Sequence, residues 1–326
     1  MEGGVKSRSR VRAGYTCYTY CEGTSSKKLH MKSTRSEQIQ RYIDSFPVLP
    51  VTVTRLMDVT SDPECSVKDV VETIHTDPSL CLTILKISNS VLFGRPQRVD
   101  SIKMAVVILG FNEVQKIALA KALINSFSKL ARKHKPYVDR FWEHSFIAGM
   151  ASRIIAQDLN IAHDIAFMGG LLHDIGKLIM LETFTDNYAL ERWMTTLSNE
   201  ETLHEELQIH SFTHDMLGGQ LLQKWLFPEN LIAAVAYHHR PDEVAKDKKG
   251  IAHIIQLADI LSFYCCNQKL LWDDDILTFI QASLPDIQSR WQSFGVTLED
   301  DAIERWFNWL LTNHRQGSNL NSAFSI

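Results

Sequence analysis

The chain has 326 residues, of which 45% are hydrophobic and 22% are charged, and its formal net charge at pH 7 is −4. This composition is typical of a globular protein with one large domain or about two smaller ones, and so mild a charge gives no indication of binding to nucleic acid or a membrane surface. No stretch approaches the roughly 18 consecutive apolar residues of a membrane span, and the N-terminus lacks the apolar centre of a signal peptide. We therefore expect a cytoplasmic protein, whose six cysteines are free thiols because none forms a CxxC pair.

Residues 1–36 form a basic tail. They contain eight basic and two acidic side chains, a net charge of +6, with few aliphatic residues and no helical periodicity. Such a segment is typical of a disordered terminus, and the alternative is contact with nucleic acid or anionic lipid. Met31 is a possible true start of the protein, because the residues before it show no structural pattern.

Residues 37–135 are predicted to form an all-helical N-terminal lobe, and strand signals are scarce along the whole chain. Ser66 followed by Asp69 is a capping-box pattern at the start of an apolar helical repeat. Asp77 and Pro78 mark another helix start, because Asp accepts hydrogen bonds from free N–H groups and Pro lacks the donor that the first turn leaves unpaired. The sequence of the lobe shows no obvious catalytic or ligand-binding pattern.

A polar break at 133–136 precedes a second helical series, residues 136–267, and residues 268–326 are predicted to form a helical C-terminal extension. Apolar residues recur at helical spacing throughout the second series. Its predicted helices cover residues 137–159, 163–181, 186–208, 213–226, 228–239 and 251–266.

Seven histidines and aspartates of the second series lie in apolar or small-residue helical surroundings. They are His144, His173, Asp174, His214, His238, His239 and Asp259. A lone inward histidine is more often a hydrogen-bonded core residue than a ligand, but an unpaired carboxylate is costly to bury. Because a borderline divalent metal takes imidazole nitrogen and carboxylate oxygen as ligands, the set favours one or two metal ions in a helical core.

The segment Gly169–Lys177 comes closest to a motif. Its two leading glycines allow another backbone to approach closely, and Gly176 is predicted to break the helix just after Asp174. The adjacent His173 and Asp174 are about 100° apart on a helix, so both can reach one cavity. Lys177 is either a phosphate contact or a solvated surface lysine, and the spacing alone favours neither.

In the order of its motifs the chain resembles the HDOD family of bacterial signalling domains, which belongs to the HD superfamily of metal-dependent phosphohydrolases. The resemblance covers about residues 40–266 and implies an all-α fold, with a helical N-terminal lobe packed on an HD-like helical core. The motifs that carry it are Phe46–Pro50, Asp77–Leu80, Asn89–Gly94, Ser101–Gly110, Trp142–His144, Gly170–Lys177, His214 with Gly218, Trp225–Glu229 and His238–Pro241.

The resemblance also implies two overlapping ligand sets, by analogy with the related HD-GYP phosphodiesterases. Asp174 is expected to bridge the two ions. The other ligands are expected to be His144, His173 and Asp259 for one ion, and His214, His238 and His239 for the second. The Gly-Tyr-Pro motif that follows the double histidine in those enzymes is absent, because His239 is followed here by Arg-Pro-Asp-Glu-Val. This departure argues against hydrolysis of cyclic di-GMP.

Three functions remain open. The family favours a regulatory signal-transduction protein with protein partners in a signalling pathway and one or two divalent ions, which could be Fe, Mn, Zn or Mg. The alternative is a metal-dependent phosphohydrolase or phosphodiesterase acting on a nucleotide or cyclic nucleotide. In it a hydroxide bridging two ions would attack phosphorus, and Asp174 and Lys177 would be the catalytic residues. A third candidate is a di-iron redox sensor, since histidine-rich sets suit iron.

Overall fold

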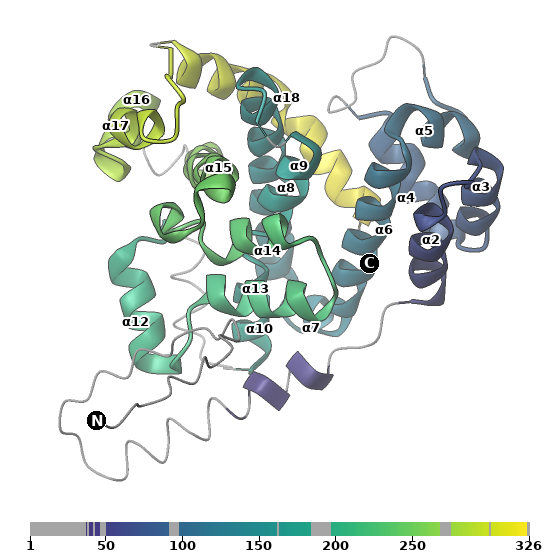
Figure 1. Ribbon diagram of the computed structural model, residues 1–326. Coiled ribbons are helices and arrows are strands. Elements are labelled where there is room, and N and C mark those ends of the chain that lie inside the picture. Colours follow the sequence, from purple (N-terminus) through teal and green to yellow (C-terminus); the bar gives the residue numbers. More distant parts are fainter. Residues whose placement is uncertain are drawn as a thin grey trace, which may run out of the picture.

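The computed structural model contains helices and no strand in the part of the chain that it describes, which confirms the predicted all-α fold (Figure 1). The expected basic tail, with Met31, lies outside the described residues. The structure describes residues 37, 39–41, 43–45, 50–90, 98–161, 163–183, 197–267, 275–299 and 301–324.

The N-terminal helices form a lobe at one side of the molecule (Figure 1). They are α2 (Val51–Ser61), α3 (Val67–His75), α4 (Pro78–Ser88), α5 (Ile102–Leu109), α6 (Phe111–Ser126) and α7 (Ser128–Lys133). The predicted helix starts are confirmed. Ser66 and Asp69 form a capping box, and the Asp77 side chain accepts a hydrogen bond of 3.0 Å from the backbone N–H of Leu80. These caps satisfy donors that a helix start otherwise leaves unpaired.

The second helical series forms the core that carries the seven predicted ligands. Its α-helices are α8 (Lys135–Asp158), α9 (His163–Leu172), α10 (Ile175–Thr183), α12 (Glu200–His210), α13 (His214–Lys224), α14 (Glu229–Ala236) and α15 (Lys249–Asn267). Two short 3-10 helices, η2 (Pro241–Glu243) and η3 (Lys246–Lys248), connect α14 to α15. The predicted helix over 186–208 is described only from residue 197, and it begins at Glu200 because Asn199 caps it.

The helical segment predicted over 163–181 is interrupted close to the break predicted just after Asp174. The chain leaves the helical path at His173 and Asp174, between α9 and α10, and Gly176 lies in the first turn of α10, after the break. Gly176 serves close packing. A Cβ atom there would lie 1.9 Å from the backbone oxygen of His214, which is far inside contact distance. The glycine therefore lets the start of α10 abut the start of α13.

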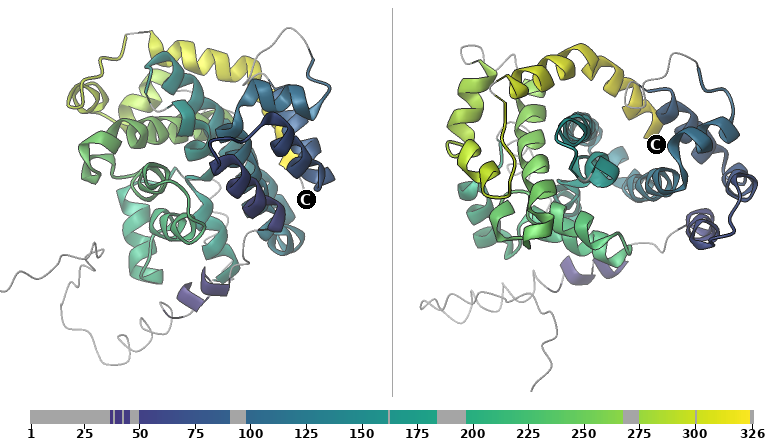
Figure 2. Two further views of the ribbon diagram at one scale, coloured as in Figure 1. Left: turned by 45° about the vertical axis from the view of Figure 1, so that its right-hand side comes forward. Right: turned by 45° about the horizontal axis from the view of Figure 1, so that its top comes forward.

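Helix α8 is the central element of the core, with α9, α15 and α18 packed around it (Figure 2). The approach of α9 is close because Gly170 has no side chain: a Cβ there would lie 2.4 Å from the Ala148 backbone oxygen. This confirms at Gly170 the close backbone approach predicted for the glycine pair, and it brings the end of α9 next to the ligand-bearing face of α8.

The C-terminal extension packs on both parts of the molecule. It contains α16 (Ile276–Ser283), α17 (Ile287–Gln292) and α18 (Ala302–Phe324). Helix α18, yellow in Figure 2, runs over α8 and reaches α4 and α6 of the N-terminal lobe. Its Trp306 donates a hydrogen bond of 2.9 Å from the indole N–H to Asp158 at the end of α8. The extension thus fixes the N-terminal lobe against the core.

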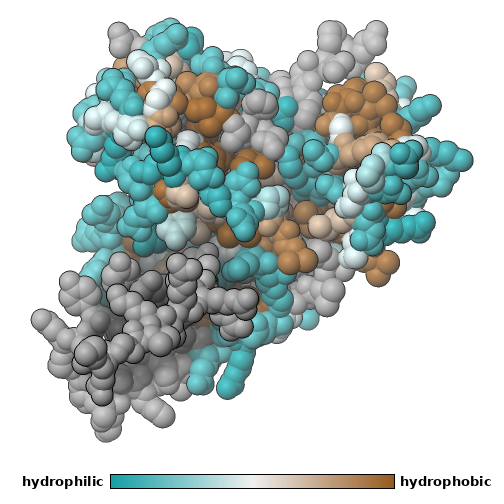
Figure 3. All heavy atoms as spheres, in the orientation of Figure 1, coloured by the Kyte–Doolittle hydropathy of each residue, from teal (hydrophilic) through white to brown (hydrophobic). Residues whose placement is uncertain are grey.

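The surface is mostly polar on the face in Figure 3, with an apolar patch over the N-terminal lobe near α5. Leu82 of α4 and Val107 of α5 are among the exposed large apolar side chains of the lobe. Within the described ranges, no helix combines the length and the apolar character needed to cross a membrane.

Candidate metal centre

Five separate segments bring the seven predicted ligands together. Helix α8 carries His144, the break between α9 and α10 carries His173 and Asp174, and α13 begins with His214. His238 and His239 follow α14, and Asp259 lies on α15. Their nitrogen and oxygen atoms form two groups that could each hold an ion, and Asp174 belongs to both.

The first group contains His144, His173, Asp174 and Asp259. The Nε2 atom of His144 lies 3.2 Å from Nε2 of His173 and 3.1 Å from Oδ1 of Asp259. The Nε2 atom of His173 lies 3.4 Å from both Asp174 Oδ2 and Asp259 Oδ1. Two nitrogens and two oxygens thus converge on one point, the donor set of a first-row divalent ion.

The second group contains Asp174, His214, His238 and His239. The Nε2 atom of His214 lies 3.2 Å from Oδ1 of Asp174 and 2.9 Å from Nε2 of His239. The Nε2 atom of His238 lies 3.8 Å from the same Asp174 oxygen. Asp174 therefore directs Oδ1 at one group and Oδ2 at the other, which is the geometry of a bridging carboxylate.

The other ring nitrogen of several histidines is held by the protein. Nδ1 of His173 donates to the Gly170 carbonyl at 2.7 Å, and Nδ1 of His238 donates to the Val235 carbonyl at 2.8 Å. Because a carbonyl oxygen only accepts, Nδ1 carries the proton, and Nε2 of the neutral ring is left with a lone pair for a metal.

Ser262 orients His144 in the same way. Its hydroxyl donates to the Asp259 backbone oxygen at 2.8 Å, so its oxygen must accept the bond of 2.9 Å to Nδ1 of His144. The proton of His144 is thus on Nδ1 and its Nε2 faces the first group.

The histidines of the site differ in the direction in which their surroundings shift their pKa values. Burial opposes a charge on His173, but Asp174 and Asp259 outweigh it and raise its pKa to about 10. Burial likewise opposes a charge on His214, and Glu206 with Asp174 raises its pKa to about 9. Burial and the neighbouring imidazolium charges lower the pKa of His238 to about 4. The protons on His173 and His214 therefore neutralise part of the negative charge of the carboxylates. Bound metal ions would neutralise the same charge.

The residues fit a metal by a further observation. Asp174 Oδ1 and His238 Nε2 are buried atoms without a hydrogen-bond partner in the described structure. Leaving such atoms unpaired costs about 1–3 kcal/mol each, and more for a charged group. Both belong to the second group and are directed at its centre, where an ion would satisfy them.

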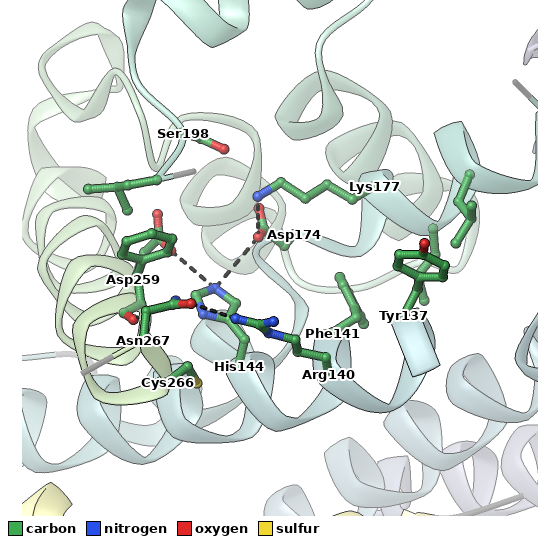
Figure 4. A pocket seen from close by; sticks show the side chains of 14 residues that line it. Tyr137, Arg140, Phe141, His144, Asp174, Lys177, Ser198, Asp259, Cys266 and Asn267 are labelled. Atoms are coloured by element: carbon green, nitrogen blue, oxygen red, sulfur yellow. Dashed lines mark hydrogen bonds and ion pairs between the residues drawn. The ribbon is translucent and has the colours of Figure 1, made fainter. Parts of the chain in front are cut away.

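Lys177 is not the solvated surface residue that its spacing allowed. It is 8% exposed, and its Nζ lies 2.6 Å from Oδ2 of Asp174. Burial would lower its pKa, but Asp174 and Asp259 raise it, so the ammonium is retained. Lys177 also lines a pocket of about 660 Å³, including space open to solvent, that reaches the first group (Figure 4).

Sequence reasoning missed the residues that support the ligands. Glu206 of α12 accepts from Nδ1 and from the backbone N–H of His214, each at 2.8 Å. Asp215, fully buried, accepts a bond of 3.0 Å from Arg240 and so ties the start of α13 to the residue after His239. The spacing of Glu206, eight residues before His214, gave no helical signal, because a loop separates the two.

Comparisons with known proteins agree with the fold. A candidate phosphohydrolase from Shewanella amazonensis SB2B superimposes with a TM-score of 0.64 at 20% identity, over 88% of this chain and 98% of that one. A candidate signal transduction protein from Marinobacter aquaeolei VT8 gives 0.62 at 19% identity, over 90% of this chain and 66% of that one. Identities this low establish the fold alone.

An uncharacterised protein of Treponema pallidum (strain Nichols) is 21% identical over 221 residues, which cover 67% of this chain and 42% of that protein. The chain spans less than half the length of the curated relatives it matches. The HDOD domain family matches residues 46–241, well over half of the chain. Together with the helical core that holds the His and Asp groups, this match shows that the chain belongs to the HDOD family.

Proposed function

We propose that this chain is a regulatory HDOD protein that binds one or two divalent ions through His144, His173, Asp174, His214, His238, His239 and Asp259. One observation carries the proposal: two convergent ligand groups share the Asp174 carboxylate. The groups are largely buried and their histidines are oriented by hydrogen bonds to Nδ1. Such supporting bonds are characteristic of metal-ligating histidine.

The chemistry of the donors restricts the ion. Imidazole nitrogen and carboxylate oxygen, with no thiolate among the ligands, suit Fe, Mn or Zn better than Cu(I). Two ions would bring four positive charges next to Asp174 and Asp259. They would displace the protons that the raised pKa values of His173 and His214 keep on these two imidazoles. The protein partners of the proposed signalling role would then respond to the metal-loaded core.

A second function, metal-dependent phosphohydrolysis, is favoured by the pocket beside the first group (Figure 4). Divalent ions there would supply Lewis acidity at a phosphoryl oxygen and an activated water. The chain's own Lys177 would hold a non-bridging oxygen with its buried ammonium, and Asp174 would orient that lysine at 2.6 Å. The absence of Gly-Tyr-Pro after His239 argues for a substrate other than cyclic di-GMP.

One experiment separates the two functions. The protein is loaded with Mn²⁺ or Fe²⁺, its metal content is measured, and turnover of bis-p-nitrophenyl phosphate and of cyclic dinucleotides is followed. Metal without turnover supports the regulatory role and refutes the hydrolase. Turnover that is lost in His173→Ala and Asp174→Ala supports the hydrolase, whereas turnover that survives both substitutions comes from a contaminant.

A further inference from the structure

Arg140 lies at the mouth of the metal centre, one helical turn before His144 on α8, and lines the same pocket (Figure 4). Its Nη2 donates a hydrogen bond of 2.5 Å to Oδ1 of Asn267 at the end of α15. Asn267 is itself buried and donates from Nδ2 to the Phe263 carbonyl at 2.9 Å. The guanidinium is therefore held in place by an amide that is fixed at its other end.

The partner of Arg140 is neutral, and this sets its electrostatic role. No carboxylate among the described residues lies within ion-pair distance of Arg140. A positioned guanidinium with an unneutralised charge is suited to a phosphate, which it can bind through two parallel N–H···O bonds. Because the neutral Asn267 orients Arg140, no ion pair within the described structure neutralises the guanidinium, and its charge can interact with a ligand.

The pocket floor lies between two cations. Figure 4 shows Lys177 and Arg140 on opposite sides of Asp174 and His144, with Asp259 beside them. Lys177 is paired with Asp174 at 2.6 Å, so part of its charge is balanced within the protein. Arg140 has no such ion pair among the described residues, and it is the cation at the outer side of the metal centre that can meet an incoming anion.

Much of the remaining wall of the pocket is apolar. Tyr137 and Phe141, on the same face of α8 as Arg140, line it (Figure 4). Leu178 and Leu181 of α10 line it as well. An inorganic anion is not stabilised by an aromatic and aliphatic wall, whereas burial of a flat organic group against such a wall is favourable.

We propose that this pocket binds a mononucleotide. Arg140, positioned by Asn267, binds its terminal phosphate at the outer edge of the metal centre, and Tyr137 and Phe141 contact its base or sugar. The proposal rests on the proposed metal site, which would hold the inner oxygens of the same phosphate. It narrows the ligand from phosphate compounds in general to a phosphomonoester with one organic group.

The test measures binding to the metal-loaded full chain by titration calorimetry. The probe is the phosphonate analogue of 5′-AMP, in which a methylene group replaces the ester oxygen, so that turnover cannot remove it. Adenosine and inorganic phosphate are titrated in parallel. We expect Arg140→Gln to weaken phosphonate binding about tenfold or more, because it removes a charged hydrogen-bonding group, and to leave adenosine binding unchanged.

A second variant tests the neutral partner. Asn267→Asp keeps the shape of the side chain but places a carboxylate on Arg140, and it should weaken phosphonate binding to a similar extent. Arg132→Gln, at an exposed position before α8, is the matched control and should bind as the wild type does. Phosphonate binding that is equal in wild type, Arg140→Gln and Asn267→Asp overturns the proposal, as does an affinity for inorganic phosphate equal to that for the phosphonate.

Metal content is measured on the same samples, so that the two failures are distinguishable. Wild-type protein without bound metal overturns the proposed function. If the metal-loaded wild type and Arg140→Gln bind the phosphonate equally well, the mononucleotide site is refuted and the proposed metal centre is not.

Discussion

The substitution Glu206→Gln tests whether residues outside the ligand set tune one half of the metal centre. Glu206 accepts two bonds from His214, one from Nδ1 and one from the backbone N–H, each at 2.8 Å. Gln keeps the shape and can still accept one of them. It removes the negative charge that makes the His214 imidazole a stronger donor toward a metal.

The expected effect follows from the geometry. His214 belongs to the second ligand group and not to the first. Loss of a carboxylate behind a ligating histidine typically weakens metal binding 10- to 100-fold, which corresponds to about 1.4–2.7 kcal/mol. One of the two ions should therefore bind more weakly by this amount, and the other, held by His144, His173 and Asp259, should keep its affinity.

Competition of the loaded protein with a chelator of known affinity measures both constants. Glu201→Gln is the matched control, because Glu201 lies on the same helix at an exposed position. Two equal losses in Glu206→Gln, or no loss in either constant, would refute the assignment of His214 to a separate ion. Far-UV circular dichroism checks that the variant keeps its helical content.

Three further outcomes are expected. Gly176→Ala should destabilise the protein by about 3 kcal/mol or more in urea unfolding, because its Cβ would overlap the His214 backbone oxygen at 1.9 Å; a loss below 1 kcal/mol would contradict this packing. Burial lowers the pKa of His253 to about 4, so its contribution to stability is present above about pH 6.5 and is lost as the pH falls toward 4. Between pH 7 and pH 5 the wild type should lose about 2 kcal/mol more unfolding free energy than His253→Leu, and parallel losses would refute the burial argument. Chelation of the loaded protein should lower the unfolding free energy by about 2.7 kcal/mol for each ion present at 100 times its dissociation constant, and an unchanged urea midpoint would contradict metal binding in the folded core.

The fold could be predicted because its determinants are local. The Ser66 capping box and the Asp77–Pro78 start place helices without knowledge of the rest of the chain. The ligands His144 and Asp259 could be selected for a similar reason, because each shares an apolar or small-residue face of its own helix. Side chains that point into the core of a small helical domain lie close to one another, and His144 and Asp259 belong to the same ligand group in this structure.

The support of the site could not be predicted, because it depends on contacts between elements. Ser262 orients His144 from a helix 118 positions later in the chain, and Arg140 bonds Asn267 across 127 positions. Nothing in the local pattern of either residue indicates the other. The break predicted just after Asp174 lies at His173 and Asp174, but the sequence does not predict the role of Gly176, because its close contact is with the His214 backbone in another helix.

Anomalous X-ray diffraction from crystals of the Mn²⁺-loaded protein tests the central claim most directly. We predict two anomalous peaks, one on each side of the Asp174 carboxylate. One should lie within bonding distance of His144, His173 and Asp259, and the other within bonding distance of His214, His238 and His239, with metal–ligand distances of about 2.0–2.3 Å. A loaded crystal with no peak beside Asp174, or with manganese bound elsewhere on the chain, would contradict the account.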